Sequence, residues 1–338
     1  MNIPHICDFA KIATRGYHYI GLMEDGYCYT WGGNEYGQCG NETTTDVPIP
    51  TLLPFLEKVV DVAVGDYHSL FCTQYGKIYS AGGNFEGQLG RGRYAKRTSL
   101  AKVAIPETIV KVFAGAYNSF ALSKSGTLYI WGNNNLKELG NCDTTKPCAV
   151  EFPFAISTIS SGYGFTTILT KNGDVYNWGI NDYGQMGDGT QKNRYVPQKI
   201  PALSQVQKLV SGIYHSLVLT KDGIVYSWGW NYCGQLGNGS IDNQFVPVQI
   251  PLPGKASDSA TSGYTSYVKL EDGRVFAFGS NNNLEIGSKY KKEVLTPVEI
   301  HHTDENLLYL PFKIKGYTPG YGKLEQEMRK GWQREMEM

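Results

Sequence analysis

Apolar and polar residues alternate in four short stretches between residues 205 and 250, and turn residues separate the stretches. QVQKLVSG at 205–212 alternates and ends in small residues, and HSLVLTKDG at 215–223 closes on Asp-Gly, a strong hairpin signal. IVYSWG at 224–229 is β-branched and aromatic, and FVPVQI at 245–250 contains a proline that suits an edge strand. The pattern predicts four β-strands, and no stretch shows sustained helical periodicity.

The same block recurs along the chain. The glycine that ends its third stretch lies at Gly32, Gly82, Gly132, Gly179, Gly229 and Gly279, so the period is 50 residues, with one interval of 47. A fixed period of this length with four strands per repeat is typical of a propeller blade. We therefore expect an all-β fold, a β-propeller of six four-stranded blades over residues 1–305. The repeat units lie roughly at 8–57, 58–107, 108–154, 155–204, 205–254 and 255–300.

The residue before the recurring glycine is aromatic in most units, and we expect these rings to fill the space between blades. They are Trp31, Trp131, Trp178, Trp228 and Phe278. Ala81 takes this place in the second unit, so we expect that blade to pack differently. Asn recurs two residues after the glycine and opens a turn with the pattern N-x-x-G-Q-L-G. We interpret this turn as structural rather than phosphate-binding, because a phosphate loop needs a following helix and usually a lysine.

Composition excludes several classes of protein. The 338 residues carry 31 basic and 31 acidic side chains, and this balance argues against a module for nucleic acid or an anionic membrane. No run of about 18 apolar residues exists, and the first residues lack the plan of a secretory signal. The seven cysteines are scattered without a C-x-x-C pair, so we expect free thiols in a cytoplasmic protein.

The repeat resembles that of the regulator of chromosome condensation family. GIYHSLVLTKDGIVYSWGWNYCGQLGNG at 212–239 carries the resemblance, which extends over about residues 8–300. It implies a β-propeller. Members of the family include nuclear exchange factors for the GTPase Ran, modules of giant ubiquitin ligases, a plant ultraviolet-B photoreceptor and interaction scaffolds. The usual propeller of the family has seven blades, whereas this sequence holds six units.

Three segments compete for the outer strand of the last blade. They are NIPHI at 2–6, TPVEI at 296–300 and LYLPFKI at 308–314, and the sequence leaves all three open.

The resemblance implies several functions, and the sequence carries the features of some of these functions and lacks those of others. Exchange factors of the family insert a wedge between strands, and here the units have equal length apart from the one that is shorter by three. The photoreceptor members carry the pattern G-W-R-H-T, and the equivalent positions here read GDYHS, GAYNS and GIYHS. A ubiquitin ligase needs a separate catalytic domain, for which this chain is too short. We predict a non-enzymatic scaffold for a protein partner. The alternatives are a guanine-nucleotide exchange factor for a Ran-like small GTPase and a structural component of a ciliary or microtubule assembly, with a cytoskeletal or ciliary location as the alternative to a cytoplasmic one.

No pattern indicates catalytic chemistry. The recurring His18, His68 and His215 occupy one place in three blades, which is typical of a structural hydrogen-bonding role. Asp66, Asp182 and Asp188 lie in loops without the paired geometry of an acid and a base, and we interpret them as solvated charges. We expect no catalytic residue, no cofactor and no metal site.

Tyrosines mark one end of the blades. The loops after the first and third strands of a blade emerge on the same face because consecutive strands run antiparallel. At the residue before the histidine position these loops carry Tyr17, Tyr67, Tyr117, Tyr214 and Tyr264, and the fourth unit has Tyr163 one place earlier. Tyrosine is enriched at interfaces, so we predict that this face binds the partner. The alternative is that the rings only pack between neighbouring blades.

The C-terminal extension, residues 306–338, is the one segment outside the repeats. Leu324, Met328, Trp332 and Met336 recur every four residues, which predicts an amphipathic helix that anchors the chain in a groove of a partner. The alternatives are a frayed end on the propeller or disorder. Tyr317 and Tyr321 lie in GYTPGYG, which resembles short tails of proteins that decorate ciliary microtubules. We predict Tyr317, Tyr321 and Trp332 as partner contacts.

Overall fold

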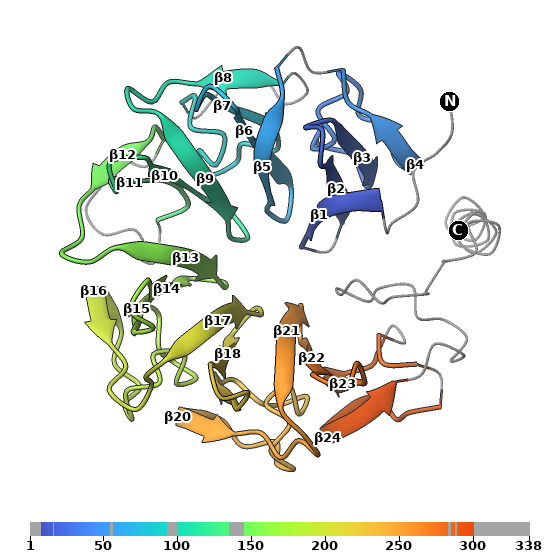
Figure 1. Cartoon of the computed structure of the whole chain (residues 1–338), viewed down its shortest axis with the longest axis vertical. Helices are drawn as coiled ribbons and strands as arrows, with labels where there is room; N and C mark the ends of the chain where they lie inside the picture. Colours follow the sequence, from blue (N-terminus) through green and yellow to red (C-terminus); the bar gives the residue numbers. More distant parts are fainter. Residues whose placement is uncertain are drawn as a thin grey trace. The chain divides into compact units, whose positions relative to one another are not determined.

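The computed structural model describes residues 8–15, 17–54, 57–92, 100–134, 145–282, 285–287 and 289–300. Within these residues the regular elements are 24 β-strands, arranged as six four-stranded antiparallel sheets (Figure 1). Blades one to three contain β1 (Phe9–Thr14), β2 (His18–Met23), β3 (Cys28–Gly32), β4 (Val47–Leu52), β5 (Val59–Val64), β6 (His68–Thr73), β7 (Ile78–Gly82), β8 (Ala101–Val103), β9 (Ile109–Ala114), β10 (Asn118–Ser123), β11 (Leu128–Gly132) and β12 (Cys148–Val150). Blades four to six contain β13 (Ile156–Ser161), β14 (Phe165–Thr170), β15 (Val175–Gly179), β16 (Arg194–Lys199), β17 (Val206–Ser211), β18 (His215–Thr220), β19 (Val225–Gly229), β20 (Gln244–Gln249), β21 (Ala256–Ser262), β22 (Thr265–Leu270), β23 (Val275–Ser280) and β24 (Glu293–Ile300).

The fold is a six-bladed β-propeller, so the predicted fold class is confirmed. In every sheet the strands are neighbours in chain order, and each sheet lies inside one of the repeat ranges given above. The chain divides into two compact units, of which the first holds blades one to three and the second holds blades four to six. Each unit is described by itself below.

The outer strand of the sixth blade is β24, which pairs antiparallel with β23. TPVEI at 296–300 forms the end of β24 and is therefore the segment that fills this place. The two competing segments, 2–6 and 308–314, lie outside the described residues, as does the extension at 306–338.

The core of each unit lies along the second and third strands of its blades. Every residue of β6, β10, β14 and β18 is buried, whereas most of β16, an outer strand, is exposed. The first strands of neighbouring blades contact one another, for instance β5 with β9 and β17 with β21 (Figure 1). The second strands also contact the next blade, as β6 does with β9 and β18 with β21, which explains why all their residues are buried, polar ones included.

Buried hydrogen bonds join neighbouring blades. His68 Nε2 lies 2.8 Å from Ser119 Oγ in the next blade, and Ser119 Oγ donates to the carbonyl oxygen of Gln88 at 2.8 Å. The indole N–H of Trp131 donates to the same carbonyl at 2.8 Å. Since the serine hydroxyl has one hydrogen, His68 Nε2–H must donate to the serine oxygen. The same arrangement occurs for His18, Ser69 and Gln38 and for His215, Ser266 and Gln235.

The three histidines of these joints are fully buried and neutral. Burial lowers the pKa of His18, His68 and His215 to about 3. Repulsion from His68 in its protonated form lowers the pKa of His18 further, and the charge of Arg15 lowers the pKa of His68. Their position agrees with the structural role that their recurrence in the sequence indicated.

The second blade packs differently at Ala81, as its sequence predicts. A methyl group added to Gly90 would lie 2.8 Å from Trp131 Nε1. At the equivalent Gly40 a methyl group would instead lie 3.4 Å from Ala81 Cβ, with Leu100 at 3.6 Å and Leu53 at 3.7 Å. Two leucines therefore line the space that an indole ring fills in the next joint.

The recurring asparagine closes the turn after the third strand in blades one, four, five and six. Asn231 accepts a hydrogen bond from Leu236 N at 2.9 Å, and its Nδ2 donates to the carbonyl oxygens of Ser240 and Asp242. Asn34, Asn181 and Asn281 make equivalent bonds. The glycine-rich stretch is thus a structural turn.

The cysteines depart from the sequence-based expectation at one position. Cys28, Cys39, Cys72 and Cys233 are free, but Cys148 is disulfide-bonded, so the expectation of free thiols is wrong for that residue. In the part of the chain that the structure describes, no helix is long and apolar enough to span a membrane.

Candidate partner-binding surfaces

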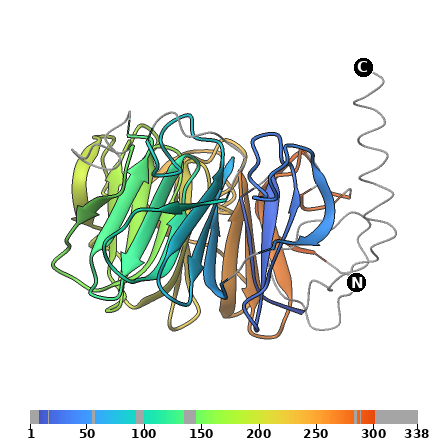
Figure 2. The same ribbon diagram turned by 90° about the horizontal axis from the view of Figure 1, so that it is seen from above.

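The loops after the first and third strands of a blade lie at the same end of the sheet. A backbone hydrogen bond ties them together: Gly33 N donates to Tyr17 O at 2.7 Å, and Trp230 N donates to Tyr214 O at 3.0 Å. Equivalent bonds occur in blades two, four and six. The strands of each sheet run between two ends at which the turns gather, as Figure 2 shows. The tyrosine-bearing loops and the asparagine turns of one unit therefore share one end.

Five rings gather at this end of the first unit, and we call them the first aromatic surface: Tyr17, Tyr36, Tyr67, Phe85 and Tyr117. Tyr17 stacks on Tyr67 with ring centroids 5.1 Å apart, and Tyr117 lies 6.1 Å from Tyr67. The ring of Tyr36 packs edge-to-face against the rings of both Tyr67 and Phe85. Tyr17 is 57% exposed and Phe85 is 51% exposed, so the cluster remains open to solvent.

Six rings gather at the same end of the second unit, and we call them the second aromatic surface: Tyr163, Tyr183, Tyr214, Trp230, Tyr232 and Tyr264. Trp230 is central, because its indole lies 4.9 Å from Tyr264, 6.0 Å from Tyr214 and 6.1 Å from both Tyr183 and Tyr232. Tyr232 is 65% exposed and Tyr183 is 37% exposed.

The structure brings the predicted tyrosines together within each unit. Tyr17, Tyr67 and Tyr117 meet in the first surface, and Tyr214 and Tyr264 meet in the second, together with Tyr163. Their rings contact rings of neighbouring blades and also keep exposed area, so packing and exposure occur together. The predicted tail contacts, Tyr317, Tyr321 and Trp332, lie outside the described residues.

Sequence reasoning missed the rings that come from the asparagine turns. They are Tyr36, Phe85, Tyr183, Trp230 and Tyr232. The signal was present, because an aromatic residue lies within two positions of the turn asparagine in these units. Combined with the rule that both loops emerge at one end, that spacing places these rings beside the predicted tyrosines.

The pKa values of three surface tyrosines are raised, and the charges around the two surfaces differ. A hydrogen bond with Tyr17 and burial raise the pKa of Tyr67, and burial raises the pKa of Tyr214 and of Tyr264. Beside the first surface, Arg15 Nε pairs with Asp66 at 3.0 Å. Asp188 likewise pairs with Arg194, at 2.7 Å, so these two loop aspartates are ion-paired rather than solely solvated.

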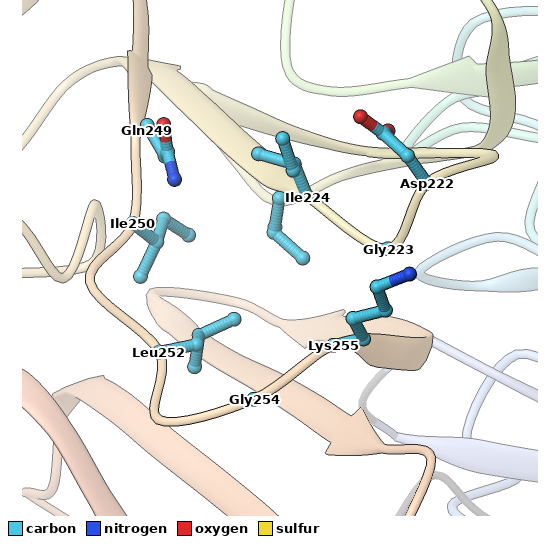
Figure 3. A pocket seen from close by; sticks show the side chains of 9 residues that line it. Asp222, Gly223, Ile224, Gln249, Ile250, Leu252, Gly254 and Lys255 are labelled. Atoms are coloured by element: carbon cyan, nitrogen blue, oxygen red, sulfur yellow. The ribbon is translucent and has the colours of Figure 1, made fainter.

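A cavity of about 310 Å³ lies at the opposite end of the fifth blade, next to the β18–β19 hairpin (Figure 3). Ile224, Ile250 and Leu252 line it with aliphatic side chains, and Asp222 and Lys255 lie beside it. These side chains form no nucleophile–base pair. Among the described residues, no group of three histidine, cysteine or carboxylate side chains is placed to hold a metal ion.

The chain is similar to known proteins in sequence pattern and in fold. A family model described as RCC1-like domain matches residues 2–262. The structure of Prp20p from Saccharomyces cerevisiae superimposes with a TM-score of 0.77 at 22% identity, over 87% of this chain and 77% of that one. Human WBSCR16 gives a TM-score of 0.65 at 28% identity, over 73% and 68% of the two chains. The CRINKLY WD40 ectodomain of the Arabidopsis thaliana receptor kinase ACR4 gives 0.54 at 15%, over 87% and 82%. No curated protein sequence matches.

Proposed function

The chain belongs to the RCC1-like domain family, and from this premise we propose that it is a non-enzymatic scaffold that binds a protein partner through its two aromatic surfaces. The observation that carries the proposal is the gathering of exposed rings at one end of each unit. Each surface takes rings from three consecutive blades. Clusters of exposed apolar area on a soluble protein commonly mark interaction sites.

The composition of these surfaces also supports protein binding rather than catalysis. Tyr and Trp are enriched among the residues that dominate binding energy at protein interfaces. The recurring histidines, which would be the natural acid–base groups, lie in the core between blades with their Nε2 atoms engaged by serine hydroxyls. The surfaces themselves carry phenol groups, and the pKa of Tyr67, Tyr214 and Tyr264 is raised rather than lowered, opposite to what a tyrosine that acts as a base needs.

The proposal is tested by affinity capture with the full chain, followed by affinity measurements on each recovered partner. We compare the double variants Tyr17→Ala/Phe85→Ala and Tyr183→Ala/Tyr232→Ala with the wild type. Tyr75→Ala is the matched control, because Tyr75 is exposed but lies in the turn after β6, at the opposite end of its blade. Loss of interface aromatics is expected to weaken binding at least 30-fold, equivalent to about 2 kcal/mol. If both double variants bind every recovered partner as tightly as the wild type does, and their melting temperatures are unchanged, the proposal is contradicted.

A guanine-nucleotide exchange factor is the second candidate. It is favoured by the similarity in fold to Prp20p, whose structure was reported with binding properties to Gsp1p and histones. Against it, the connection between the third and fourth strands covers 33–46, 180–193 and 230–243 in blades one, four and five, so none of these carries an insertion. The test is nucleotide release from a panel of small GTPases, Ran first. Accelerated release with catalytic amounts of the chain would establish exchange activity.

The tail supplies the second contact in this proposal. Comparing capture by the full chain with capture by a chain that ends at residue 305 tests whether Tyr317, Tyr321 and Trp332 contribute. Association with microtubules only by the full chain would favour a ciliary or cytoskeletal role over a cytoplasmic one.

A further inference from the structure

We propose that the second aromatic surface binds an extended, arginine-bearing segment of the partner, with Asp182 as the counter-charge. The proposal rests on the scaffold function above and adds to it the chemistry of what is bound at this unit. Three observations carry it: the arrangement of the rings, the charge around them, and the contrast with the first surface.

The rings present faces that a guanidinium group can cover. Tyr232 stacks nearly parallel on Trp230, with 13° between the ring planes, and two thirds of its area faces solvent. Tyr183 also contacts Trp230, at 50°, and keeps more than a third of its area exposed. A cation over the face of Trp or Tyr is attracted by the ring quadrupole. Arg suits such a site better than Lys, because its planar guanidinium both stacks and donates hydrogen bonds.

The charge next to these rings is negative. Asp182 directly precedes Tyr183, is exposed, and lies near enough to contribute to the raised pKa of Tyr214. The loops that supply the rings, 162–164, 181–187, 212–214, 230–237 and 262–264, contain Asp182 and no lysine or arginine. Lys192 lies later in the same turn, but among the described residues no lysine or arginine nitrogen lies within ion-pair distance of Asp182. The second surface thus offers a carboxylate without its own cation.

The first aromatic surface differs in one cation. Its turns carry Glu35 before Tyr36 and Glu86 after Phe85, so it is acidic as well, but its loops also contain Arg15, which pairs with Asp66. The loops that supply the rings of the second surface contain no arginine. We therefore assign the arginine-bearing segment to the second surface, and the Phe85→Ala control tests that choice.

The test uses the full chain and short fluorescein-labelled peptides that differ only at their two arginine positions. The peptide Gly-Ser-Arg-Tyr-Arg-Ser-Gly is compared with versions in which both arginines are citrulline, which is neutral and nearly isosteric, or lysine. Fluorescence anisotropy is measured for the wild type, Asp182→Asn and Tyr232→Ala. Asp222→Asn is the matched control, because this exposed aspartate lies at the opposite end of the blade and Asn-Gly also suits its turn. Phe85→Ala controls for the first surface.

We expect the arginine peptide to bind the wild type and the two controls alike, with an affinity that falls as salt rises. Asp182→Asn and Tyr232→Ala should each weaken it at least fivefold, citrulline should reduce binding at least tenfold, and lysine should bind more weakly than arginine. The proposal is overturned if the wild type shows no saturable binding. It is also overturned if citrulline binds as tightly as arginine, or if Asp222→Asn or Phe85→Ala weakens binding as much as Asp182→Asn.

The outcomes separate this inference from the scaffold proposal. A captured partner that loses affinity for Tyr183→Ala/Tyr232→Ala but is indifferent to Asp182→Asn and to salt keeps the surface as a binding site and refutes the arginine-bearing segment. A partner that is indifferent to every one of these variants refutes both.

Discussion

Replacing His18, His68 and His215 with asparagine is expected to make the propeller less sensitive to acid. Asparagine is a fitting substitute because Asn118 already occupies this place in blade three, where it pairs with Gly132 in the register that His68 keeps with Gly82. The histidines matter because they are buried between blades, so protonation would place a charge where no water can solvate it.

The magnitude follows from the difference in pKa between the folded and unfolded chains. Each histidine has a pKa of about 3 when folded, against a reference value of 6.5. Between these values the unfolded chain binds a proton that the folded chain does not, so the free energy of unfolding falls by about 1.4 kcal/mol per histidine per pH unit. This stability is fully present above pH 6.5. At pH 5 the loss is about 2 kcal/mol for one histidine and about 6 kcal/mol for three, comparable to the whole stability of many domains.

Urea unfolding followed by tryptophan fluorescence at pH 7.5, 6 and 5 measures the effect. Most carboxylates titrate below this range, since their reference pKa values are about 4, so the histidines dominate the difference. The comparison is between pH dependences, which removes any constant cost of the substitutions. If the wild type and the triple variant lose the same free energy of unfolding between pH 7.5 and 5, the assigned role of the histidines is wrong.

Three further outcomes are expected. Trp131→Ala should lower the free energy of unfolding by about 3–5 kcal/mol in urea, because it empties the joint beside Gly90 and removes the bond to Gln88, and a loss below 1 kcal/mol would contradict this. Gly229→Ala should lower the melting temperature, since φ is 101° and the new Cβ would lie 2.5 Å from Tyr214 O, and an unchanged value would refute the strain. Lys199→Met should leave the midpoint of urea unfolding almost unchanged, because its pair with Asp174 is partly exposed, and a clear shift of the midpoint would show that the pair is more important than its exposure indicates.

The strand order of each blade could be predicted from the sequence because every turn carries its own marker. Asp-Gly or its equivalent ends the second strand, and the Asn turn follows the third, so the elements are delimited without reference to tertiary contacts. The outer strand of blade six could not be chosen, because 2–6, 296–300 and 308–314 share the same local pattern. Which of them pairs with β23 depends on contacts between segments that are distant in the chain.

The candidate surfaces could be predicted only in part. Tyr67 and Tyr214 precede the histidine position and were found by alignment of the units. Trp230, the centre of the second surface, precedes its turn asparagine, whereas Tyr36 follows its own by two residues. These rings do not share one register, so alignment of the units at a single position does not reveal them, although a search within two residues of each turn asparagine would.

The joints between blades constrain how the repeats could have diverged. Phe165 replaces the histidine in blade four, and Ser216 in the next blade bonds instead to Ser211 of its own sheet, at 3.3 Å. At two of the three histidine joints the residues that match Ser211 are Val64 and Ala114, which have no hydroxyl to offer, and at the joint of His215 the matching residue is Thr261. In the first two joints, loss of the histidine would therefore leave the serine of the next repeat without this alternative partner. The unit that must change together is accordingly the boundary between two consecutive repeats. A recombination that exchanged one repeat alone would separate its residues from the partners that they contact in the repeats on either side.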